Sequence, residues 1–269
     1  MPPPIGCAMR ILVTNDDGIN APGLKIAEAI AGALAGDGGE VWTVAPAFEQ
    51  SGVGHCISYT HPTLISEFGP RRWAAEGSPA DCVLAAVHEI MPAAPDLVLS
   101  GVNRGNNAAQ NAMYSGTVGA CIEGEMQGIR SIALSQFLGP RTQDLADPFE
   151  AAAAWGERAV RAILDHDDWG DLVHYGIFYN VNFPPCPAAE VAGLRAAAQG
   201  HRGIVPFGAT AQQAPTGRRF VWVRGERQDR RSEDGSDVAA NLDGYVSITP
   251  MRCDLTAHDR LGALSAALA

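Results

Sequence analysis

The chain has 269 residues, 46% of them hydrophobic, and a formal net charge of −11 at pH 7. This length and apolar content suffice for one large α/β domain. The acidic balance argues against a stable nucleic-acid partner, because no basic patch dominates the sequence. There is no stretch of about 18 uninterrupted apolar residues, so no membrane span and no membrane partner are expected.

The N-terminal segment lacks the basic region and long apolar core of a signal peptide. We expect residues 1–8 to form a disordered extension, with Met9 as an alternative start. The six cysteines show no paired spacing and are expected to be free thiols. Together these features predict a cytoplasmic protein.

In the first half of the chain, short apolar runs alternate with amphipathic stretches. Buried strands are expected over 10–14, 41–45 and 96–99, and short antiparallel strands within 56–68. Helices are expected over 24–34, 81–91 and 116–127. Asn20 is expected to cap the first of these helices, and Pro22 suits its first turn.

The second half continues the alternation, with strands expected over 131–135, 176–183 and 245–249. Helices are expected over 147–164 and 261–268. This βα order predicts an α/β fold with a largely parallel sheet that is covered on both faces. We expect residues 1–269 to form a single domain of this kind.

Residues 186–243 differ in character from the rest of the chain. They are rich in Ala, Gly, Gln, Arg and Asp, and their apolar runs are short. Such a segment has too few large apolar residues for a core of its own, yet it is too long for an ordinary loop. We therefore expect an extended arm or hairpin that gains stability by lying across the surface of another subunit.

Two adjacent carboxylates, Asp16 and Asp17, follow the first strand in the sequence Asn15-Asp-Asp-Gly18. Ligands of open α/β sheets bind at this carboxyl edge. Gly18 permits the turn that would bring both side chains to one point. Carboxylates held so close need a cation, a proton or a strong donor between them. The alternative is an Asx-turn and helix cap without a ligand.

Two further loops follow parallel strands and are expected at the same edge, Gln50 to Gly52 and Ser100 to Asn103. They would place the Ser51 hydroxyl and the Asn103 amide beside the two aspartates. Two carboxylates, a hydroxyl and an amide oxygen are donors typical of one divalent Mg or Mn ion. Considered alone, Ser51 and Asn103 are more typical of ordinary turns than of a metal site.

A fourth loop, Tyr114-Ser-Gly-Thr117, precedes a predicted helix. The backbone amides at a helix N-terminus favour a phosphate or another anion, and Ser115 and Thr117 add hydroxyl donors. The alternative is plain capping by one of these hydroxyls. A metal and an anion cradle at one edge together indicate phosphoryl chemistry.

In combination and order, these motifs resemble the SurE family of metal-dependent nucleoside monophosphate phosphatases. The resemblance extends from Arg10 to about His258. Its principal segments are Arg10-Ile-Leu-Val-Thr-Asn-Asp-Asp-Gly-Ile-Asn-Ala-Pro-Gly-Leu24, Gln50-Ser-Gly52, Ser100-Gly-Val-Asn-Arg-Gly-Asn-Asn107 and Tyr114-Ser-Gly-Thr-Val118. Gly77 to Val83, Gly244 to Pro250 and Asp254 to Thr256 also fit the family pattern.

The resemblance implies a three-layer α/β/α fold whose arm and C-terminal segment assemble a homodimer or homotetramer. It implies one metal ion held by Asp16, Asp17, Ser51 and Asn103, the same set reached from the loops. It also implies that the Ser115 segment lies on the phosphate side. Where many relatives carry Asp-Arg after the proline, this chain has Ala47-Phe-Glu-Gln50, and its arm is divergent.

The expected function is hydrolysis of nucleoside 5′- or 3′-monophosphates. We assign catalytic roles to Asp16, Asp17 and Asn103, and substrate phosphate binding to four residues, Asn15, Ser115, Gly116 and Thr117. The alternative is a regulatory module that binds a metal–nucleotide complex without turnover. A dinucleotide-binding Rossmann domain is disfavoured, because the first βα loop lacks the glycine fingerprint for pyrophosphate.

Overall fold

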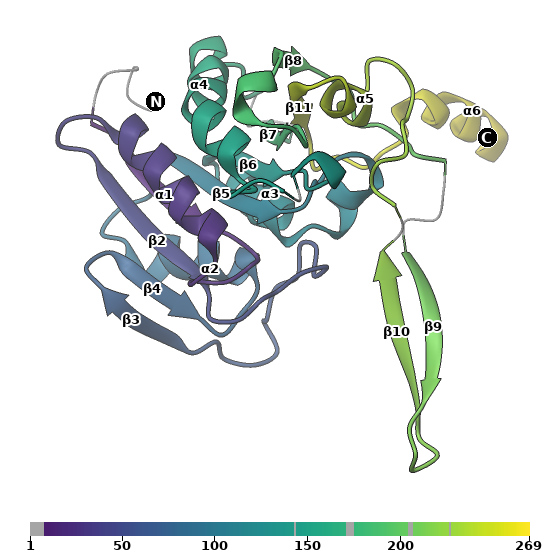
Figure 1. Cartoon of the computed structure of the whole chain (residues 1–269), viewed down its shortest axis with the longest axis horizontal. Helices are drawn as coiled ribbons and strands as arrows, with labels where there is room; N and C mark the ends of the chain where they lie inside the picture. The colour runs from purple at the N-terminus through teal and green to yellow at the C-terminus, as the bar shows by residue number, and fades with distance from the viewer. Residues whose placement is uncertain (1–7, 143, 171–174, 204–206, 226) are drawn as a thin grey trace.

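The computed structural model describes residues 8–142, 144–170, 175–203, 207–225 and 227–269. A large sheet carries helices on both faces, and a separate two-stranded hairpin projects from this body (Figure 1). The predicted disordered extension at residues 1–8 lies outside the described residues except for Ala8. Within the described residues, no helix is both long enough and apolar enough to cross a membrane.

The strands are β1 (Arg10–Thr14), β2 (Glu40–Pro46), β3 (Ile65–Gly69), β4 (Arg72–Ala75), β5 (Leu97–Arg104), β6 (Arg130–Gln136), β7 (Phe178–Phe183), β8 (Gly193–Ala196), β9 (Phe207–Gln213), β10 (Arg219–Gly225) and β11 (Tyr245–Met251). The helices are α1 (Pro22–Ala35), α2 (Pro79–Ala85), α3 (Gly116–Met126), α4 (Glu150–His166), α5 (Asp237–Leu242) and α6 (His258–Leu268).

The main sheet has nine strands in the order β3-β4-β2-β1-β5-β6-β7-β11-β8. Six neighbouring strands of this sheet, β4, β2, β1, β5, β6 and β7, run parallel to one another. At one edge β3 is antiparallel to β4, and at the other β11 is antiparallel to β7 and parallel to β8. The predicted α/β architecture with a largely parallel sheet is therefore confirmed.

Both faces of the central strands are buried, which explains their continuous apolar sequences. In β1, Ile11 and Val13 join the core under α1 and α4, while Leu12 joins the core under α2 on the opposite face. β5 repeats the pattern, with Leu97 and Leu99 on the first face and Val98 on the second. Successive side chains of a strand alternate between faces, so each strand contributes to both cores.

This topology positions the three loops that the sequence singles out. β1 pairs with β2 on one side and with β5 on the other. The chain passes from β1 to β2 toward one edge of the sheet and from β5 to β6 toward the other, which opens a crevice beyond the carboxyl ends of β1 and β5. The segments that follow β1 and β2, and the carboxyl end of β5, therefore meet at one edge of the sheet.

Several element boundaries differ from the prediction. Asn20 does not cap α1, because Ala21 holds the N-cap position and makes no side-chain cap hydrogen bond. The expected loop at Ser100 to Asn103 belongs to β5, which resumes pairing with β6 at Asn103 after a register shift. The helix expected over 81–91 is α2 followed by a π-helical turn over Ala86–Ile90.

The segment 186–243, predicted as one arm, divides into three parts. β8 joins the main sheet, and α5 is buried against it through Val238, Ala239 and Ala240. Only β9 and β10 project, pairing with each other from Phe207 to Gly225. The projecting arm therefore includes fewer residues than the predicted 186–243, because β8 pairs with the main sheet and the apolar residues of α5 pack into the body.

The described cysteines Cys56, Cys82, Cys121, Cys186 and Cys253 are all free thiols, as expected.

Candidate active site

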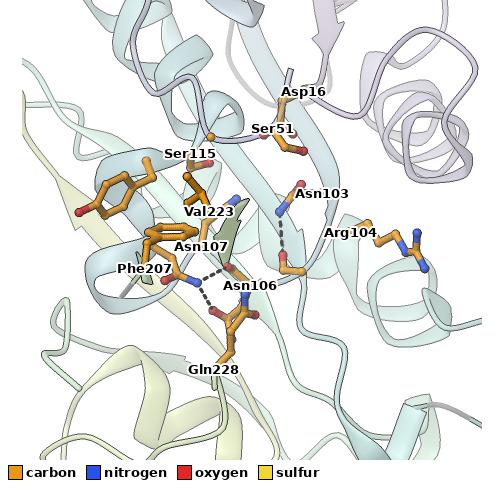
Figure 2. Close-up of a pocket in the computed structure, with 14 residues that line it drawn as sticks. Asp16, Ser51, Asn103, Arg104, Asn106, Asn107, Ser115, Phe207, Val223 and Gln228 are labelled. Atoms are coloured by element: carbon orange, nitrogen blue, oxygen red, sulfur yellow. Dashed lines mark hydrogen bonds between the residues drawn. The ribbon is translucent and has the colours of Figure 1, made fainter. Parts of the chain in front are cut away.

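A cavity of about 500 Å³ opens at the carboxyl edge of the sheet (Figure 2). Four of the eight predicted site residues line it, namely Asp16, Ser51, Asn103 and Ser115. The other four, Asn15, Asp17, Gly116 and Thr117, do not line it and lie within two residues of Asp16 or Ser115 in the sequence. The structure therefore brings together residues from the β1 loop, the β2 loop, the end of β5 and the start of α3.

The turn after β1 is held by Asn15. Its Nδ2 donates to the Gly18 carbonyl at 3.0 Å, and its Oδ1 accepts from the Gly18 N–H at 3.2 Å. Gly18 has φ of 99°, a conformation that L side chains rarely adopt. The fully buried Asn15 amide is thus engaged at both ends within the turn, while its predicted role toward phosphate stays a prediction.

Asp16, in the loop after β1, is a buried carboxylate that lies against the N-terminus of α3. It is 4% exposed, and its Oδ1 accepts a hydrogen bond from the Thr117 hydroxyl at 2.7 Å. Burial raises the pKa of Asp16 to about 6, and the charge of Asp17 adds to the rise, while hydrogen bonds from the Thr117 hydroxyl and backbone N–H oppose it. The positive end of the α3 dipole thus faces Asp16 itself.

This contact depends on the glycine at position 116. A Cβ there would lie 2.9 Å from the Cβ of Asp16 and 3.1 Å from Cγ of Pro79. Such separations are too short for ordinary packing, so a larger residue would push Asp16 away from α3. The sequence places Gly116 in a phosphate loop, and the structure adds that Gly116 allows the close approach of Asp16.

Asp17 joins the β1 loop to the end of β5. Its Oδ2 accepts the Arg104 backbone N–H at 3.0 Å. Burial raises the pKa of Asp17, and the charge of Glu49 adds to the rise, while the Arg104 N–H and its side-chain charge oppose it. The two aspartates and Glu49 therefore concentrate negative charge on one side of the site.

The loop carrying Ser51 is tied to both neighbouring segments. The Gln50 N–H donates to the Asp16 carbonyl at 2.7 Å, and the Gly54 N–H donates to the Tyr114 carbonyl at 3.0 Å. His55 in the same loop places Nε2 at 2.8 Å from Glu123 of α3. The exposed Ser51 hydroxyl donates to Glu49 at 2.8 Å, so its oxygen is held near the acidic side of the cavity.

Asn103 and Ser115 present defined polar atoms to the cavity. Asn103 Nδ2 donates to the Gly105 carbonyl at 2.8 Å, which leaves its Oδ1 as the acceptor for a ligand. Ser115 Oγ accepts the Val118 N–H at 3.0 Å and so caps α3. The Ser115 hydroxyl hydrogen can therefore be donated to an oxygen within the cavity.

The donor chemistry fits a divalent cation. Asp16 and Asp17 form no ion pair within the described residues, and only the more distant charge of the Arg104 side chain acts on Asp17. The same residues contain no group of three or more His, Cys, Asp and Glu side chains suited to a metal. The predicted set is of another kind, with two carboxylates, a hydroxyl and an amide oxygen, and hard cations accept such mixed oxygen donors.

The cavity is also lined by residues outside the eight predicted site residues. These additional lining residues include Asn106, Asn111 and Tyr114, near the predicted loops, and Phe207, Val223 and Gln228, in or just after the hairpin. The first group falls within or near segments already singled out by motif. No sequence motif near the second group indicates a site, because these residues reach this edge of the sheet only when the chain is folded.

Comparisons with known proteins agree with this arrangement. Residues 11–205 match the family described as Survival protein SurE. The chain is 63% identical over 259 residues to "5′-nucleotidase SurE" of Cereibacter sphaeroides, covering 96% of this chain and 99% of that protein. It is 63% identical over 262 residues to the protein of the same name from Ruegeria pomeroyi, covering 97% and 100%.

The fold is also similar to a solved structure, the crystal structure of the SurE protein from Aquifex aeolicus. The TM-score is 0.78 at 33% sequence identity, and the alignment covers 97% of this chain and 100% of that one. The three-layer α/β/α architecture is therefore shared over nearly the full length.

We predict that Asp16→Asn stabilises the metal-free protein. Burial disfavours the charged carboxylate at neutral pH, and the neutral amide keeps an oxygen for the Thr117 hydroxyl. In a chelating buffer, the free energy of unfolding should rise by on the order of 2 kcal/mol, measured by urea denaturation. Asp37→Asn, at an exposed position, is the control. A variant less stable than wild type would contradict this account of Asp16.

We also predict that Gly116→Ala weakens binding of a divalent cation by about tenfold or more, because Asp16 must move away from the added methyl group. Titration calorimetry with Mn²⁺ measures this effect. Gly32→Ala is the matched control, since a Cβ on that α1 residue meets nothing within 4 Å. Wild-type Mn²⁺ affinity in Gly116→Ala would show that the close approach is unimportant.

Proposed function

The chain belongs to the SurE family, and from this premise we propose that it is a 5′-nucleotidase, a hydrolase that releases phosphate from nucleoside monophosphates. One observation carries the proposal: the hydrogen bond between Asp16 and Thr117. It places an acidic centre and a helix N-terminus side by side at one cavity. An acidic centre suits a metal ion and a helix N-terminus suits an anion, and phosphoryl transfer needs both.

Asp16, Asp17, Ser51 and Asn103 are proposed to hold one Mg or Mn ion. When bound there, the ion supplies a positive charge that polarises a phosphoryl oxygen and lowers the pKa of a bound water. The mixed oxygen donors, and the lack of an ion pair to Asp16 or Asp17 within the described residues, support this assignment.

Other groups of the chain are proposed to bind the phosphate, orient the water and position Asp16. The Ser115 hydroxyl, whose oxygen is fixed by the Val118 N–H, donates to a phosphoryl oxygen. The Gly116 N–H, at the first position of α3, has no acceptor within the helix and is proposed to donate to the same phosphoryl group. Asp17, fixed by the Arg104 N–H, orients the attacking water. Thr117 acts through Asp16, because its hydroxyl and N–H both donate to that carboxylate.

We further propose that the hairpin assembles a homodimer or homotetramer. Four consecutive residues of β10, Phe220 to Val223, are each at least half exposed. A run of large apolar side chains on a projecting hairpin is typical of a surface that another subunit covers. A cytoplasmic location stays a prediction from the sequence.

We predict that phosphate release from nucleoside monophosphates requires a divalent cation. Chelation should abolish turnover, and Mg²⁺ or Mn²⁺ should restore it, because without the cation two carboxylates repel the incoming phosphate. A phosphate-release assay over a panel of nucleotides and metals provides the measurement. Undiminished turnover after exhaustive chelation would refute the metal assignment. Tight nucleotide binding without any release would instead support the regulatory module.

We predict that replacing residues 209–223 by a short turn yields a folded monomer. These residues pair only within the hairpin, and nearly all of them are exposed, so the core loses no packing. Light scattering should report an oligomer for the full chain and a monomer for the deletion, while the thermal midpoint of the core is retained. A full-length chain that is already monomeric at micromolar concentration would refute the assembly proposal.

A further inference from the structure

The hairpin contributes to the cavity as well as projecting from the body. Phe207 begins β9, Val223 lies near the end of β10, where it pairs with Ala209, and Gln228 follows β10. All three line the cavity that also contains Asp16 and Ser115. Figure 2 shows Asp16 and Ser51 at one end of this cavity, with Phe207, Val223 and Gln228 toward the other. The foot of the hairpin, defined here as these three residues, is thus a wall of the candidate active site.

An aromatic contact joins this foot to the phosphate side. The rings of Phe207 and Tyr114 pack edge to face, with centroids 4.8 Å apart and planes at 69°. Tyr114 immediately precedes Ser115, and Tyr114 as a whole residue remains 42% exposed. An aromatic surface therefore begins one residue from the hydroxyl assigned to phosphate. Such surfaces stack readily on the flat faces of nucleobases.

Polar groups occur at the same end of the cavity. Asn106 is 3% exposed, and its Oδ1 accepts from Arg202 Nη2 at 3.0 Å. Arginine only donates, so this contact fixes which end of the amide is oxygen. Asn106 Nδ2 has no partner within the described residues. A wall that combines aromatic faces with amide groups suits a heterocycle with polar edges better than an aliphatic chain.

The size of the cavity supports an organic ligand. Its volume of about 500 Å³ greatly exceeds the requirement of a phosphate ion, and it falls in the range typical of small-molecule sites. Asp16, Ser51, Asn103 and Ser115 account for the phosphate end. The remaining lining must therefore contact whatever the phosphate is attached to.

We propose that the base of the substrate stacks against Phe207 and Tyr114, so that the foot of the hairpin selects phosphate esters that carry a nucleobase. This inference rests on the proposed nucleotidase activity. Phe207 and Tyr114 are specificity-determining residues under this proposal. They do not take part in the hydrolytic step, which the β1, β2, β5 and α3 residues perform.

The test compares two substrates that differ only by the base, a nucleoside 5′-monophosphate and ribose 5-phosphate. Phe207→Ala should raise KM for the nucleotide by about tenfold, the usual cost of losing one base–aromatic stack. Its kinetics with ribose 5-phosphate should not change. Phe207→Tyr should restore the nucleotide KM, because it keeps the aromatic face. Phe68→Ala removes an exposed phenylalanine from β3 that neither lines the cavity nor belongs to the hairpin, and it should leave both substrates unaffected.

The outcomes separate this inference from the proposed function. Equal losses for both substrates in Phe207→Ala would mean a structural role and would overturn the inference. An unchanged nucleotide KM in that variant would overturn it as well. A wild-type protein that hydrolyses ribose 5-phosphate but no nucleoside monophosphate would refute the proposed function itself. A selective loss with the nucleotide, rescued by Phe207→Tyr, would establish the base-binding wall.

Discussion

The site depends on the hydrogen bond between the buried Asp16 carboxylate and Thr117. A buried charge is costly unless donors or a cation compensate it. Here the N-terminus of α3 supplies donors, and Gly116 leaves the space that the carboxylate needs. The backbone carbonyl of the same aspartate accepts from Gln50 and so holds the Ser51 loop. One residue thus connects the β1 loop, the β2 loop and α3.

The sheet provides the frame for this contact. Because β1 lies between β2 and β5, the ends of all three strands converge, and Asp17 adds a hydrogen bond to the end of β5 through Arg104. Among the described residues, neither carboxylate forms an ion pair, and a helix N-terminus lies beside Asp16. A metal-assisted nucleotidase gains from this arrangement, since its charges are positioned before the substrate arrives.

The sequence predicts the central sheet well, and it places four of the eight predicted site residues at the cavity, both because the signal is local. Strands buried on both faces are continuously apolar, so β1 and β6 can be located directly, and polar residues at their ends mark the functional edge. The prediction is less accurate where tertiary contacts decide. β8 and α5 have short apolar patterns that only the packed body makes meaningful. Phe207 reaches the cavity through the path of the hairpin, which no local pattern encodes.

The central claim is that Asp16, Asp17, Ser51 and Asn103 form one metal site at this edge. Anomalous scattering from Mn²⁺ in crystals of the full chain tests it most directly. The account predicts one strong peak in direct contact with oxygen atoms of these four side chains, beside the N-terminus of α3. A peak bound by other residues, with both aspartates free of metal, would contradict it.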